Sequence, residues 1–228
     1  MTTFFSEPKR KRFPIEPRSP RLAALMQSCV FILAANWCLQ GMRGMDMKEL
    51  GFRLGLELLL AGAILLPLVR VLPPEPAVAA AFLLAHTASF TLNGQVWVCA
   101  RYWRCYHRDA VALDGFVAAT IQELRSRPWL REAACIGSLA RAGAIRGDRA
   151  DIDLRLVFPP GATAWLRTNL LLLRLRSRAF LARIPLDLYA YAAPERLRRF
   201  AASEPLLVLL DRDHRLARLY PRRVRAWR

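Results

Sequence analysis

Three aspartates in this chain have the residue type and spacing needed to bind a metal ion. Asp151 and Asp153 stand one residue apart in "DIDL" (151–154), and Asp187 is flanked by leucines in "LDL" (186–188). Alternation of acidic and apolar residues is typical of β-strands, on which residues i and i+2 face the same way about 6.5–7 Å apart. Two carboxylates at that spacing can hold Mg²⁺, and a third acid on a neighbouring strand would complete a two-ion site with its ions ~4 Å apart.

A Gly-Ser pair precedes the paired acids and follows the short apolar run 133–136. Gly137 permits a tight turn, because it has no Cβ. Ser138 then offers a hydroxyl and a backbone N–H at the start of a short helix, where phosphate groups are commonly bound. The stretch therefore points to combined phosphate and metal chemistry.

These motifs, taken in order, resemble the DNA polymerase β-like nucleotidyltransferase superfamily. The motifs are Ile136-Gly137-Ser138, Asp151-Ile152-Asp153-Leu154 and Leu186-Asp187-Leu188. Leu139-Ala140-Arg141 is also similar to the opening of the minimal nucleotidyltransferases. The resemblance covers about residues 110–220, and one departure is Ala150, where many minimal members have a serine.

The resemblance implies a nucleotidyltransferase-fold mixed sheet flanked by helices, and transfer of a nucleotidyl group from an NTP, such as ATP, to an acceptor hydroxyl or phosphate. It implies that Asp151 and Asp153 bind metal, and that Asp187 binds metal and helps to activate the acceptor. Two Mg²⁺ ions are the implied cofactors. The implied nucleotide-binding residues are Gly137, Ser138 and Arg141.

The second half of the chain predicts an α/β arrangement that would position these residues. We expect strands over 133–136, 152–158, 184–191 and 206–210. We expect helices over 109–127, 162–183 and about 194–202. The leucines of the long helix, Leu166, Leu170 and Leu173, read as its core-packed side.

The first half of the chain predicts an α-helical membrane hairpin in front of the α/β domain. Its expected spans are 53–72 and 77–100, joined by the helix-breaking segment "RVLPPEP" (70–76). The apolar stretch 22–40 is polar enough to lie in the membrane interface. Arginine and lysine crowd both flanks of the hairpin, which favours two spans over three and places both flanks in the cytoplasm. The alternative is a buried helical hairpin in a soluble protein.

We therefore divide the chain into a basic disordered arm (1–20), a membrane-associated helical segment (21–108) and a nucleotidyltransferase-like domain with a basic tail (109–228). Five scattered cysteines without metal-type spacing indicate free thiols in a reducing compartment. We expect the protein in the inner (cytoplasmic) membrane, with the catalytic domain facing the cytoplasm. Glu57, His86 and Asn93 are polar groups inside the apolar stretches, where they would either receive a lipid headgroup or join the helices.

A formal net charge of +17 suits anionic lipid, polyphosphate or nucleic acid equally well. The first interpretation is a membrane-anchored nucleotidyltransferase whose partners are NTP and membrane lipid, with a lipid or lipid-linked glycan as acceptor. The second is a non-catalytic membrane adaptor that uses the same fold to bind nucleotide or a partner. The third is nucleic-acid binding or tailing, which the shortage of interleaved stacking aromatics disfavours.

Overall fold

The computed structural model contains a five-stranded mixed sheet in the order β3-β2-β1-β4-β5. It describes residues 10, 11, 13, 15, 17–103, 105–107, 110–141 and 150–226. Strand β1 is antiparallel to β2 and β4, whereas the outer pairs β2/β3 and β4/β5 are parallel. The strands are β1 (Glu132–Ile136), β2 (Ile152–Val157), β3 (Leu186–Tyr191), β4 (Leu206–Asp211) and β5 (Val224–Ala226).

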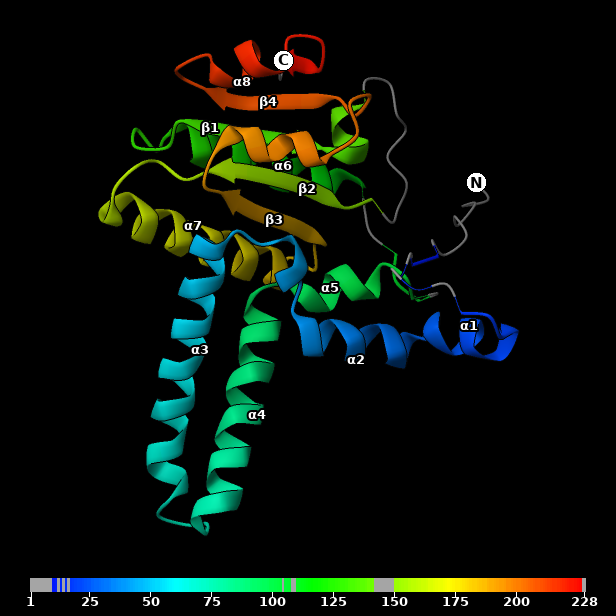
Figure 1. Ribbon diagram of the computed structural model, residues 1–228, viewed down its shortest axis with the longest axis vertical. Coiled ribbons are helices and arrows are strands. Elements are labelled where there is room, and N and C mark those ends of the chain that lie inside the picture. The colour runs from blue at the N-terminus through cyan, green and yellow to red at the C-terminus, as the bar shows by residue number, and fades with distance from the viewer. Residues whose placement is uncertain are drawn as a thin grey trace.

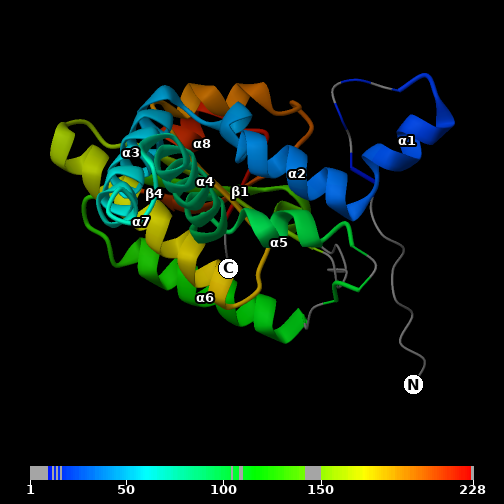
Figure 2. The ribbon, with the colours of Figure 1, turned by 90° about the horizontal axis from the view of Figure 1, so that it is seen from below.

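Helices cover both faces of the sheet (Figures 1 and 2). The larger hydrophobic core lies between one face and the helices α6 and α7, and a smaller core on the other face includes Leu197 and Leu216 from η3 and α8. The helices are α1 (Pro20–Met26), α2 (Cys29–Leu39), α3 (Met47–Leu68), α4 (Pro74–Leu92), α5 (Gln95–Ala100), α6 (Ala110–Arg125), α7 (Ala162–Leu181) and α8 (Arg215–Leu219). The 3₁₀ helices are η1 (Met42–Gly44), η2 (Gly137–Ala140) and η3 (Pro194–Arg199).

Helices α3 and α4 form a hairpin that extends away from the sheet, while α1 and α2 run crosswise at its base (Figure 1). Within the described part of the chain, α3 is the one helix that is by itself long and apolar enough to cross a membrane. Helices α1 and α2 reach the same criterion only as a pair, bent by 64°. The seam between α3 and α4 includes the buried alanines Ala77, Ala81 and Ala85, and small residues of this kind allow close helix packing.

The predicted mixed sheet flanked by helices is confirmed, and strands β1 to β4 lie within a residue or two of the expected positions. The fifth strand, β5, was not predicted, because its residues were assigned to the basic tail. Three expectations about the helices differ from the structure. The expected helical stretch 77–100 is divided between α4 and α5 at Gly94, whose left-handed φ of 69° ends the helical path. The expected helix near 194–202 is the 3₁₀ helix η3. Leu166 and Leu170 are 44% and 49% exposed, so the core-packed reading of these two residues is wrong.

Most of the predicted basic arm, namely residues 1–9, 12, 14 and 16, lies outside the described residues. Helix α1 begins at Pro20, where that arm was expected to end. Arg104 and Arg108, which contribute to the basic flank after the second span, also lie outside the described part of the chain.

The hairpin is fixed to the sheet at the free edge of β3. The backbone N–H of Ala190 donates to Glu49 (3.0 Å) and that of Ala192 donates to Asp46 (3.1 Å), both near the start of α3. Arg176 of α7 donates to the carbonyl of Leu188 and pairs with Glu49 at 2.5 Å. Because these side chains satisfy polar backbone groups that an edge strand leaves open, they join the hairpin rigidly to the strand that carries Asp187.

Candidate active site

Asp153 and Asp187 lie directly opposite one another on the adjacent parallel strands β2 and β3. Both occupy the second residue of their strands, and Ile136 at the end of β1 pairs with Asp153 on the other side. They project from the sheet face opposite α6 and α7, because the alternate residues Ile152, Leu154, Leu186 and Leu188 belong to the core beneath those helices. The alternating pattern puts two of the three predicted acids on one face, and the parallel pairing of β2 with β3 places them side by side.

The two carboxyl groups influence each other's ionisation. Burial and the neighbouring Asp187 raise the pKa of Asp153 to about 7. Burial also opposes the charge of Asp187, yet the Arg155 guanidinium holds the pKa of that carboxyl below its usual range. Asp153 is therefore the acid of the pair that takes up a proton first as the pH falls, while Asp187 remains ionised.

Arg155 explains this asymmetry. Its Nη2 lies 2.7 Å from Oδ2 of Asp187 but 3.6 Å from Oδ1 of Asp153. The guanidinium is 5.0 Å from the centre of the Tyr189 ring, and the Arg155 side chain is 5% exposed. Burial disfavours its charge, but the two aspartates raise the pKa of Arg155 above its usual value, so it stays protonated.

Asp151 is held apart from the pair. Its carboxylate forms an ion pair with Arg101, which follows α5 at the base of the hairpin. The Asp151 side chain is 13% exposed, so solvent screens this pair only in part. The third predicted acid therefore links the sheet to Arg101 at the end of α5.

Gly137 begins the turn after β1, with φ at 73°. Its backbone N–H donates to Oε1 of Glu204 at 3.0 Å, and Nη2 of Arg141 lies 3.7 Å from the same oxygen. Ser138 is half-buried in η2, and Arg141 follows that helix with a side chain 62% exposed. Of the three predicted phosphate-binding residues, Gly137 and Arg141 thus contact an anion here, and that anion is the carboxylate of Glu204.

The carboxylates fit a divalent cation in part. Asp153 and Asp187 offer hard oxygen ligands side by side, as Mg²⁺ prefers. Within residues 17–103, 105–107, 110–141 and 150–226, however, no three His, Cys, Asp or Glu side chains form a group that could hold a metal ion. Asp151 would join the pair only after release from Arg101. The donor set as it stands therefore offers two carboxylates, whereas the resemblance implies three acids around two ions.

Replacement of Gly137 by alanine is expected to lower the free energy of unfolding by about 1–3 kcal/mol, because a side chain at left-handed φ is strained. A Cβ at Gly137 would also overlap the carboxylate of Asp153. Chemical denaturation of the Gly137→Ala variant measures the loss. Gly115→Ala is the matched control: a Cβ at this helical glycine meets nothing within 4 Å. It should be neutral or stabilising, and an equal loss in both variants would contradict this account of Gly137.

The sequence prediction missed three residues that shape the site. Arg155 could have been found, since it follows Asp153 by two residues on the same strand face and interrupts an apolar strand. Arg101 and Glu204 carried no local signal, because each reaches the site only through the tertiary fold.

Comparisons with family models, with curated proteins and with solved structures find no match to this chain. The site is therefore described by its own geometry: two adjacent aspartates, two arginines that neutralise acids, and a glycine turn that binds a carboxylate.

Proposed function

We propose that this protein is a membrane-anchored nucleotidyltransferase that transfers a nucleotidyl group from an NTP to an acceptor hydroxyl or phosphate. The observation that carries the proposal is the direct pairing of Asp153 with Asp187 on adjacent parallel strands, beside the Gly137 turn. This is the arrangement that the sequence resemblance implies for the metal-binding acids. The acceptor we favour is a lipid or a lipid-linked glycan, because the chain joins the site to a candidate membrane hairpin.

In the proposed reaction the acceptor oxygen forms a bond to the α-phosphorus of the NTP, and the bond from that phosphorus to the bridging oxygen breaks, so that diphosphate leaves. Asp153 and Asp187 would hold Mg²⁺, with Asp151 joining them once released from Arg101. When bound, Mg²⁺ offsets the negative charge of the triphosphate. If the acceptor is a hydroxyl, Asp187 is the aspartate of the pair that is ionised and able to accept its proton.

Phosphate binding at the Gly137 turn would require Glu204 to leave the Gly137 N–H. Arg141 is exposed and lies beside that position, so it can follow the phosphates as Glu204 withdraws. These movements involve one carboxylate and one flexible arginine, and the sheet itself need not change.

Nucleotidyl transfer is tested by incubating membrane extracts with the protein and each NTP labelled at its α-phosphate. We expect labelled membrane material that disappears in the double variant Asp151→Asn/Asp153→Asn. Asp213→Asn, a change at an exposed carboxylate (46% exposed), is the matched control and should label normally. Labelling that survives in the double variant would contradict the proposal.

The hairpin supports the membrane part of the proposal. Leu58, Leu59 and Leu66 of α3 are 71%, 75% and 70% exposed, and the exposed side chains of α4 include Phe82 and Leu84. Apolar exposure of this extent would be costly in water and favourable in lipid. The crosswise placement of α1 and α2 at the base of the hairpin suits elements that lie in the membrane interface (Figure 1).

We expect the wild-type protein to float with phosphatidylcholine vesicles in a density gradient, and the double variant Leu58→Asp/Leu66→Asp to remain at the bottom. A charged residue costs about 2.5–3.5 kcal/mol at the centre of a spanning helix, where Leu58 lies, and less near its end, where Leu66 lies. Val111→Asp, at a valine 76% exposed on α6, is the control and should float. Flotation of the double variant would show that membrane association does not depend on α3.

A second candidate function, a non-catalytic membrane adaptor, is favoured by the two arginines. Arg155 and Arg101 already neutralise Asp187 and Asp151, which would reduce the need for a cation. Binding of an NTP in the presence of Mg²⁺ without release of diphosphate would identify this alternative.

A further inference from the structure

Arg101 holds one of the three acids that the proposed reaction uses. Its guanidinium forms an ion pair with Asp151, and the two side chains are 18% and 13% exposed. Asp151 precedes Asp153 by two residues, so their Cα atoms lie about 7 Å apart or less. In the free protein, the acid next to the Asp153–Asp187 pair along the chain is therefore bound to an arginine and is not available to a metal ion.

Arg101 also lies within electrostatic reach of the paired acids. Burial and Asp187 raise the pKa of Asp153, and the charges of Arg155 and Arg101 oppose this rise. Burial likewise opposes the charge of Asp187, and the same two arginines favour it. An arginine so close to the pair can contact either Asp151 or a phosphate bound at the aspartates, because guanidinium groups bind carboxylates and phosphates in the same way.

A second cation, Lys11, lies beside Arg101. The Lys11 Nζ is 5.7 Å and the Arg101 guanidinium carbon 4.8 Å from the centre of the Tyr102 ring, and Arg101 donates to the Tyr102 hydroxyl at 2.7 Å. Burial lowers the pKa of Lys11, and the charge of Arg101 acts in the same direction. No ion pair joins Lys11 to an acidic side chain of the described residues. Two cations thus lie together here, which favours the approach of an anion.

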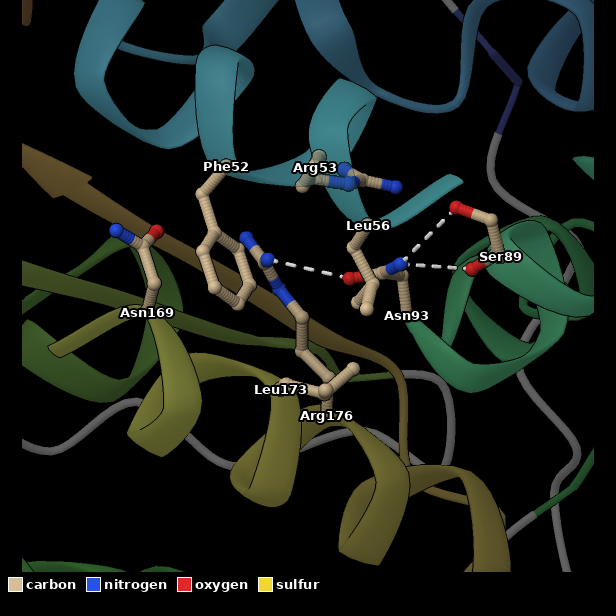
Figure 3. A pocket seen from close by; sticks show the side chains of 8 residues that line it. All are labelled: Phe52, Arg53, Leu56, Ser89, Asn93, Asn169, Leu173 and Arg176. Atoms are coloured by element: carbon tan, nitrogen blue, oxygen red, sulfur yellow. Dashed lines mark hydrogen bonds between the residues drawn. The ribbon is translucent and has the colours of Figure 1, made fainter. Parts of the chain in front are cut away.

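The helix that ends at Arg101 is fixed to the sheet domain. Arg101 directly follows α5, and the indole N–H of Trp97 in α5 donates to the carbonyl of Phe180 in α7 at 2.8 Å. Just before α5, the side chains of Arg176 and Asn93 point toward one another and form a hydrogen bond of 3.3 Å (Figure 3). Because the backbone is held on both sides of α5, a change of partner at Arg101 involves its side chain and not the helices.

We propose that Arg101 controls when the third acid joins the site. In the free protein Arg101 holds Asp151, and when a triphosphate binds at the aspartates Arg101 moves to a phosphate and releases Asp151 to the metal ion. The inference rests on the proposed nucleotidyl transfer, which supplies the triphosphate as a bound NTP. Arg101 keeps a counter-charge throughout, because a phosphate replaces the carboxylate. Metal and nucleotide would therefore bind cooperatively.

The first test measures Mg²⁺ binding to the full chain in neutral detergent, without nucleotide, by calorimetry. We expect Arg101→Gln to bind Mg²⁺ about tenfold or more tightly than the wild type, because Asp151 is then free; changes of outer partners commonly alter metal affinity by this amount. Arg131→Gln, which breaks the exposed pair with Asp213, is the matched control and should bind as the wild type does. A gain of affinity cannot come from loss of the fold.

The gain must depend on the released acid. Arg101→Gln/Asp151→Asn should bind Mg²⁺ no more than slightly better than Asp151→Asn alone. An unchanged Mg²⁺ affinity in Arg101→Gln, or an equal gain without Asp151, would overturn the proposal.

The second test is the reciprocal one and remains decisive if Arg101→Gln does not fold. Inorganic triphosphate is titrated into the full chain in the presence of a chelator. We expect Asp151→Asn to bind it about tenfold or more tightly than the wild type, because Arg101 is then free for a phosphate. Arg101→Lys/Asp151→Asn, which keeps the charge but not the guanidinium, should retain only part of this gain. If Asp151→Asn bound triphosphate no better than the wild type, Arg101 would not exchange its partner.

These titrations separate the inference from the proposed function. If the wild type binds NTP with Mg²⁺ but neither variant gains affinity for its ligand, the exchange at Arg101 is wrong and nucleotidyl transfer stands. If both gains appear but the wild type binds no NTP in the presence of Mg²⁺, the exchange stands and the proposed transfer is contradicted. Absence of all binding would overturn both.

Discussion

Above pH 7 the Asp153→Asn variant is expected to be more stable than the wild-type protein by about 2–4 kcal/mol, and this advantage should vanish near pH 4. The pKa of Asp153 is raised from 3.8 to about 7, by burial first and by Asp187 second. One pKa unit corresponds to about 1.4 kcal/mol. Because the folded protein favours the protonated form of Asp153, wild-type stability is fully present below pH 4 and is lost as the pH rises through 7. Asparagine has no proton to lose and avoids this loss.

Urea denaturation of both proteins between pH 4 and pH 8, in the presence of a chelator, measures the difference. Asp213→Asn is the control, because that carboxylate is 46% exposed and should give no comparable pH-dependent gain. A constant difference between Asp153→Asn and the wild type across this pH range would contradict the assignment of the raised pKa to Asp153.

Glu49→Gln is expected to lower the free energy of unfolding by about 3–5 kcal/mol, because it leaves the Arg176 guanidinium buried without its counter-charge. The side chains of Glu49 and Arg176 are 0% and 3% exposed, so solvent cannot replace the lost partner. The same carboxylate accepts a hydrogen bond from the backbone of Ala190 at the sheet edge. The variant should therefore loosen the hairpin from β3 as well as destabilise the sheet domain.

Denaturation of Glu49→Gln and hydrogen exchange at the amide of Ala190 measure the two effects. The matched control is Asp213→Asn, which breaks the exposed pair between Arg131 and Asp213 and should cost less than about 1 kcal/mol. If Glu49→Gln lowered the free energy of unfolding as little as the control does, the pair of Glu49 with Arg176 would not hold the hairpin on the sheet.

Much of the sheet domain could be predicted from the sequence because its signals are local. Alternation in "DIDL" and "LDL" sets which side chains face the core, and the same alternation puts Asp153 and Asp187 on one face. That they are direct neighbours depends on the parallel pairing of β2 with β3, which periodicity alone could not provide.

Ionic partners were not predictable in the same way. Asp151 pairs with Arg101 across fifty residues of sequence, and Arg176 pairs with Glu49 across a still longer separation. Charged residues of one sign are numerous in this chain, so composition cannot select the arginine that meets a given acid. The polar residues of the apolar stretches illustrate this: Glu57 pairs with His86 at 2.6 Å, whereas Asn93 meets Arg176 of the sheet domain.

The long helix α7 shows why a leucine pattern alone does not define a core. Leu171, Leu172 and Leu175 are buried against the sheet, whereas Leu166 and Leu170 face outward. Both sets follow helical spacing. The position of the sheet decides which of the two sets is covered.

Nucleotide binding in the presence and absence of Mg²⁺ tests the proposed function most directly. The full chain in neutral detergent is titrated with each of the common NTPs, by calorimetry, with Mg²⁺ or with a chelator. We expect saturable binding of at least one NTP, and we expect this binding to require Mg²⁺. It should be lost in Asp153→Asn/Asp187→Asn and retained in Asp213→Asn. Binding that is unchanged by the chelator and by loss of both aspartates, or no binding of any NTP by the wild-type protein, would contradict it.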